Sequence, residues 1–142
     1  MNFDEFKALF FKFNFEPLGL KIGSFIYEES VSESDSKQMF ISYSVILYCN
    51  TIEIDLRYSV TADYFRARIK KDEKNYFTIS EYLKSKNRET EDISLDVRPG
   101  ESTSEHFLRF LKQVFDLTKG ELQPIIRGNI WEDIPRDWMG YK

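Results

Sequence analysis

A β-hairpin between Gln38 and Val60 constrains the fold more than any other part of the sequence. Every odd position from 39 to 49 is apolar or aromatic, and so is every even position from 52 to 60. This alternation on both sides of a turn at Asn50-Thr51 predicts two antiparallel strands. The predicted apolar pairs are Cys49 with Ile52, Leu47 with Ile54, Val45 with Leu56, Tyr43 with Tyr58, and Ile41 with Val60. A slip of one residue would turn these side chains to opposite faces, so the pattern specifies one register.

The flanking segments extend the hairpin into a larger sheet. A strand is predicted over residues 18–27, and the acidic stretch 28–37 is predicted to be the loop that joins it to the hairpin. Residues 64–70 alternate again and predict a further antiparallel strand. Among the registers of correct parity, cross-strand charge pairing favours the one that sets Asp55 opposite Arg68 and Glu53 opposite Lys70. Residues 76–79 predict a short fifth strand.

Helices are predicted both before and after the strands in the sequence. Residues 3–13 and 104–119 carry apolar side chains at helical spacing, and Ser102, Thr103 and Ser104 offer caps for the second helix. Shorter helices are predicted over residues 81–86, capped by Ser80, and over 121–127, while 87–100 reads as a loop with room for one edge strand. We therefore expect a single α+β domain over residues 1–142, an antiparallel meander of four to five strands with N-terminal and C-terminal helices packed on one face.

The other face of the sheet is expected to be in contact with water. It should carry aromatic, polar and charged side chains, namely Phe40, Ser42, Ser44, Ile46, Tyr48, Glu53, Asp55, Arg57, Tyr64, Arg66, Arg68 and Lys70. A mixed face of this kind can bind a protein, and it is equally typical of a solvated sheet.

Charge and composition exclude several classes of protein. A net charge of −4 and a pI near 5.1 disfavour nucleic acid as a partner, because binding the phosphate backbone needs clustered Lys and Arg. No apolar run approaches the ~18 residues of a membrane span. The single cysteine and the charged start Met1-Asn2-Phe3-Asp4-Glu5 predict a cytoplasmic protein without a disulfide.

No group of residues in the sequence indicates catalysis. His106 is the only histidine, which excludes a histidine-rich metal site, and its place in the first turn of a helix predicts a surface or capping position. Cys49 is predicted to be a buried, inert thiol. Pairs of nearby carboxylates occur in the sequence, but acidic residues this common produce such pairs by chance. The glycines are scattered and form no phosphate-binding loop. We expect a non-enzymatic protein with no catalytic residues, no metal and no cofactor.

The closing run Trp131-Glu132-Asp133-Ile134-Pro135-Arg136-Asp137-Trp138 is too aromatic for a frayed end and predicts a docked tail through Tyr141. The chain resembles the small acidic immunity proteins of bacterial toxin systems in four respects: this closing run, its size, its acidity and its phenylalanine-rich α+β pattern. The resemblance implies a cytosolic inhibitor that binds and blocks a cognate toxin. We expect the chain to be a monomer or a weak dimer. Size and acidic pI also resemble type III secretion chaperones, and a regulatory bacterial domain is a third alternative.

Acidic stretches are the predicted contacts for a basic toxin domain. The first holds Glu28, Glu29, Glu33 and Asp35, with Tyr27 or Phe40 as an aromatic anchor, and the second holds Glu91 and Asp92 beside Glu89 and Asp96. An acidic loop can steer toward a basic cleft and occupy it in place of phosphate. Each run is also typical of a solvated loop.

Overall fold

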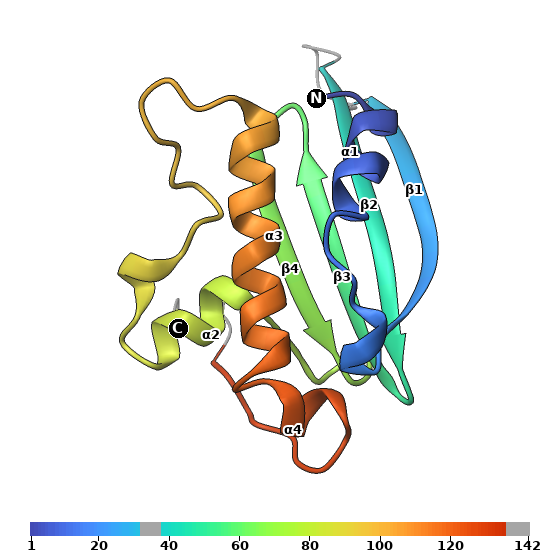
Figure 1. Cartoon of the computed structure of the whole chain (residues 1–142), viewed down its shortest axis with the longest axis vertical. Coiled ribbons are helices and arrows are strands. Elements are labelled where there is room, and N and C mark those ends of the chain that lie inside the picture. The colour runs from blue at the N-terminus through green and yellow to red at the C-terminus, as the bar shows by residue number, and fades with distance from the viewer. Residues whose placement is uncertain (32–37, 136–142) are drawn as a thin grey trace.

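A five-stranded antiparallel sheet with helices on one face forms the fold (Figure 1). The structure, a computed structural model of the chain, describes residues 1–31 and 38–135. The strands are β1 (Lys21–Val31), β2 (Met39–Cys49), β3 (Ile52–Ser59), β4 (Tyr64–Lys70) and β5 (Tyr76–Thr78), and they lie in the sheet in chain order. The helices are α1 (Phe3–Phe10), α2 (Ile79–Ser85), α3 (Thr103–Lys119) and α4 (Gln123–Ile126), with 3₁₀ turns η1 (Glu16–Leu18) and η2 (Glu89–Glu91). The predicted α+β meander is confirmed.

The two predicted strand registers are also confirmed. Four of the five apolar pairs of the hairpin are cross-strand partners, and the fifth is joined by a 2.8 Å hydrogen bond from the Val60 amide to the Ile41 carbonyl. Between β3 and β4 the register is the one favoured by charge, with Asp55 opposite Arg68 and Glu53 opposite Lys70. Side-chain alternation and opposite charges therefore align three central strands.

Strand β1 begins and ends later than predicted. It runs from Lys21 to Val31, so Glu28 and Glu29 belong to the strand and not to a loop. Residues 28–31 pair with Ser42 to Met39 of β2. The sequence there shows no alternation because β1 is an edge strand, on which charged side chains are common and both faces can be wet. The rest of the predicted loop, residues 32–37, lies outside the described residues.

The start of α2 and the end of α1 also differ from prediction, and α4 is shorter than the predicted 121–127. Thr78, not Ser80, caps α2: its hydroxyl accepts from the Glu81 amide while the Glu81 carboxylate accepts from the Thr78 amide. Because of this reciprocal capping box, the helix begins at Ile79, two residues before the predicted start at residue 81. Helix α1 ends at Phe10 rather than at residue 13. Helix α3 begins after a similar box between Ser102 and Glu105 and extends to Lys119, as predicted. Within the described segment 87–100 the structure has the η2 turn and no strand.

Aromatic rings fill the layer between helices and sheet. The ring of Phe6 on α1 stacks on Phe107 of α3 at 4.8 Å, and Phe107 stacks in turn on Phe65 of β4 at 5.4 Å. All three side chains are buried. In Figure 1, α1 and α3 accordingly lie on the same side of the sheet. Ring stacking thus joins both helices to the sheet's apolar face.

His106 belongs to this core, which corrects the predicted surface or capping position. Its side chain is buried, its ring meets Phe65 edge-on at 4.9 Å, and Nε2 donates to the Ile93 carbonyl oxygen at 2.6 Å. The loop before α3 folds back over the first turn of the helix, which sequence spacing along the helix alone does not reveal.

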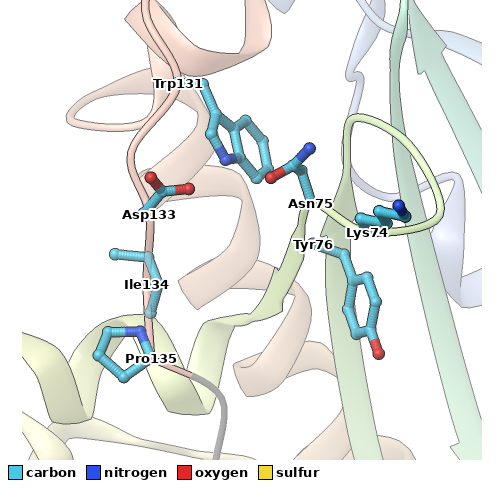
Figure 2. A pocket seen from close by; sticks show the side chains of 7 residues that line it. All are labelled: Lys74, Asn75, Tyr76, Trp131, Asp133, Ile134 and Pro135. Atoms are coloured by element: carbon cyan, nitrogen blue, oxygen red, sulfur yellow. The ribbon is translucent and has the colours of Figure 1, made fainter.

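The closing segment docks beside β5. The Trp131 ring lies 5.4 Å from Phe77, and Ile134 is 9% exposed. A hollow of about 320 Å³ lies between this segment and the start of β5. Figure 2 shows Trp131, Asp133, Ile134 and Pro135 on one side and Lys74, Asn75 and Tyr76 on the other. The predicted docking of the tail is confirmed for Trp131 and Ile134, while residues 136–142 lie outside the described residues. None of the helices in the described part of the chain is long and apolar enough to cross a membrane.

Candidate functional site

Three arginines surround one aspartate on the outer face of the sheet, the face opposite α1 and α3. The Asp55 Oδ2 atom lies 3.5 Å from Arg68 Nη2, 3.8 Å from Arg66 Nη2 and 3.9 Å from Arg57 Nη2. We call these four residues the arginine cluster. Three guanidinium groups therefore share one carboxylate oxygen.

The strand register produces this arrangement. Odd positions of β3 and even positions of β4 point to the outer face, and Asp55 lies opposite Arg68 while Arg57 lies opposite Arg66. The result is a block of four charged side chains on two adjacent strands. Directly opposed like charges such as Arg57 and Arg66 destabilise a sheet.

The cluster is only partly hydrated and only partly hydrogen-bonded. Asp55 is 6% exposed, and the arginine side chains are 29–30% exposed. Asp55 Oδ1 and the Nε atoms of all three arginines are buried, and no atom of the described residues is their hydrogen-bond partner. Burial, followed by the charge of Arg57, lowers the pKa of the Arg66 guanidinium from its ordinary value. The cluster thus combines excess positive charge with unused hydrogen-bonding groups.

A hollow of about 200 Å³ adjoins the cluster. Its lining comes from β1, β2, β3 and the turn after β3, namely Glu28, Ser30, Phe40, Ile41, Ser42, Arg57, Ser59, Thr61 and Ala62. Arg57 belongs to both the hollow and the cluster. Phe40 is 45% exposed at this point, which leaves much of an aromatic ring at the surface. We call the arginine cluster and this hollow together the outer-face site.

The first predicted acidic stretch is divided between the two faces of β1. Glu28 and Phe40 line the hollow, as members of the outer-face site. Tyr27 lies on the helix side, where its ring packs 5.8 Å from Tyr43 and its hydroxyl donates to the Glu29 carboxylate. This hydrogen bond raises the pKa of Tyr27. Glu33 and Asp35 lie outside the described residues.

The second predicted acidic stretch is paired within the protein. Arg88 donates from Nε and Nη2 to Glu91 at 2.9 and 3.1 Å, and from Nη1 to Glu121 at 2.6 Å. The Asp92 carboxylate accepts from the Ser94 amide at 3.0 Å. Arg88 therefore offsets the negative charge of Glu91, and the amide hydrogen bond occupies one oxygen of Asp92. The structure does not bring them together with Glu28 and Phe40.

Comparison with known proteins identifies no relative: no family model, no curated protein and no solved structure matches the chain. Within residues 1–31 and 38–135, no group of three His, Cys, Asp or Glu side chains is placed to hold a metal ion. The outer-face site must therefore be interpreted from its own geometry. The arginines were predicted to share this face, but their excess over nearby acids only becomes apparent in three dimensions.

Proposed function

We propose that this chain is a non-enzymatic protein-binding domain and that the outer-face site is its binding surface. One observation carries the proposal: Arg57 and Arg66 face each other with Asp55 as the shared carboxylate for three arginines. Arginine and aromatic residues are enriched in protein interfaces and dominate their binding energies. The exposed Phe40 ring beside Arg57 supplies the aromatic component.

The finer proposal is that the protein is a bacterial immunity protein, which binds and blocks a cognate toxin in the cytoplasm. It is supported by the resemblance in size, acidity and closing aromatic run, and by the absence from the sequence of a residue set suited to catalysis. A binding domain needs only a surface, and the outer-face site offers shape, charge and apolar area together.

If the immunity proposal holds, a large toxin gene should lie next to the gene for this chain, whereas genes for a secretion apparatus would favour the chaperone alternative. Co-expression with the product of that adjacent gene tests the function. The immunity proposal expects the chain to restore growth of cells that produce this toxin, and to co-purify with the toxin. Arg57→Gln combined with Arg66→Gln should weaken protection against the toxin. Arg127→Gln should not, because Arg127 is exposed directly after α4 and does not belong to the outer-face site. Unchanged toxicity in the presence of excess wild-type protein would contradict the immunity role. A constitutive dimer that holds an unfolded effector would instead favour the secretion-chaperone alternative.

A further inference from the structure

We infer that the partner contacts the outer-face site with an acidic side chain, whose carboxylate binds between Arg57 and Arg66. This inference rests on the proposed function and names the chemistry of the contact. The acidic stretches of the sequence predicted a basic group on the partner, in contact with Glu28 or Glu91. The inference gives the partner's contacting group the opposite charge.

The distances within the arginine cluster support a second carboxylate. Charge-assisted hydrogen bonds between guanidinium and carboxylate groups are normally about 2.7–2.9 Å long. Asp55 Oδ2 is 3.5 Å from its nearest arginine and 3.9 Å from Arg57, so it lies among the three groups without closely binding any of them. An added carboxylate would relieve the Arg57–Arg66 repulsion and accept from guanidinium Nη–H groups, since the side chains are partly exposed while their Nε atoms are buried.

The hollow provides a route for this carboxylate. Arg57 forms part of its wall, and Ser42 and Ser59 line it with hydroxyl groups that can also donate to an anion. Phe40 borders the same space and offers apolar contact to the rest of the partner's side chain. A protein side chain satisfies both features, since it brings a charged end on an apolar stem.

The surrounding charges favour a single carboxylate over a polyanion. Glu28 lines the hollow, and Glu53 lies next to the cluster on β3. The whole chain carries a net charge of −4. An extended polyanion such as nucleic acid would be repelled by these acids, whereas one carboxylate interacts mainly with the nearest arginines.

Nuclear magnetic resonance of the isolated chain tests the inference without a partner. The probes are acetate, as a stand-in for an Asp or Glu side chain, and inorganic phosphate, each titrated against chloride at constant ionic strength. We expect the Nε–H signals of Arg57 and Arg66 to shift saturably with acetate, and Arg66→Gln to weaken this binding by roughly fivefold or more. Arg127, whose Nε donates to Gln123 at 2.8 Å, is the matched control and should show no saturable shift.

Two results would overturn the inference. Absence of a saturable shift at Arg57 and Arg66 with both anions would show that the cluster does not bind an oxyanion. Phosphate binding more than about tenfold tighter than acetate would replace the carboxylate by a phosphate group. Because the experiment uses the chain alone, its outcome is independent of whether the adjacent gene's product binds. Failure of the inference is thus distinguishable from failure of the proposed function.

Discussion

Arg57 on β3 lies directly opposite Arg66 on β4, and the Nη2 atoms of both are within 4 Å of the same Asp55 oxygen, at 3.9 and 3.8 Å. Two like charges in cross-strand positions oppose sheet pairing, and Asp55 is the group that offsets them. Since Asp55 is nearly inaccessible to water, the energetics of this face depend strongly on its charge. The arrangement leads to predictions for stability as well as for binding.

Asp55→Asn should destabilise the protein by about 3 kcal/mol, because it leaves three half-buried arginines without their common carboxylate. Urea denaturation at low salt measures this loss. The effect should diminish as salt screens the remaining repulsion. A loss below about 0.5 kcal/mol, the range of ordinary surface substitutions, would show that Asp55 does not stabilise the cluster.

Arg66→Gln should change the free energy of unfolding by no more than about 0.5 kcal/mol, because removal of the Arg57 repulsion offsets the lost attraction to Asp55. The two substitutions should also be coupled. In the Arg66→Gln background, Asp55→Asn should destabilise by at least about 1 kcal/mol less than it does in the wild type. Simple additivity in this double-mutant cycle would contradict the shared-carboxylate geometry.

Arg109, an arginine outside the cluster, makes stability depend on acid pH. Its Nε and Nη2 atoms donate to the two Glu101 oxygens at 2.5 and 2.9 Å, and this lowers the pKa of Glu101 from about 4.5 to about 2. The Glu101 carboxylate is protonated more readily in the unfolded chain than in the folded one. The contribution of Glu101 to stability is therefore present above pH 4.5 and is lost as the pH falls toward 2. Glu101→Gln should reduce the slope of stability against pH in that window, where Asp72, Glu73 and Glu91, whose pKa values are also lowered, contribute to the rest. Arg109→Gln should reduce the slope by a similar amount, and a slope that neither substitution changes would exclude the pair as one of its sources.

The docked closing segment is predicted to stabilise the fold. Trp131→Ala removes a ring packed 5.4 Å from Phe77 and should cost about 2 kcal/mol, which lowers the melting temperature by roughly 5 °C or more. Removal of residues 129–142 should lower it at least as much. Lys86→Gln is the matched control, because it removes the exposed ion pair with Glu132 and the contact of the ammonium with the Tyr82 ring, and no apolar packing of the tail; it should change stability by less than about 1 kcal/mol. A truncated chain with an unchanged melting curve would contradict a stabilising tail.

The fold was predictable where side chains alternate and where charges on adjacent strands match. The hairpin from Met39 to Ser59 and the register of Asp55 with Arg68 follow from these two rules. The end of β1 was not predictable in the same way, because residues 28–30 of this edge strand are polar on both faces and Val31 is exposed. His106 was misplaced because its burial depends on a distant loop that packs over α3.

The candidate site was predictable only in part. Sequence alternation assigns Arg57, Arg66 and Arg68 to one face, but it does not show that Asp55 alone lies among them. Counting charges along the chain indicated an acidic surface around Glu91. That count sets Arg88 and Arg98 against four acids. It does not show that Arg88 binds Glu91 and also Glu121, 33 residues away in the sequence. Net charge at a site depends on contacts between distant segments, which a linear pattern does not contain.

The most direct test of the outer-face site is the dissociation constant for the product of the adjacent gene, measured by surface plasmon resonance with matched variants. Arg57→Gln and Arg66→Gln should each weaken binding by tenfold or more, mainly through faster dissociation, since each removes one side of a buried charge contact. Glu91→Gln and Arg127→Gln should change it by less than about twofold, because these side chains lie outside the site. Equal affinities for wild type and both arginine variants would contradict the outer-face site as the binding surface.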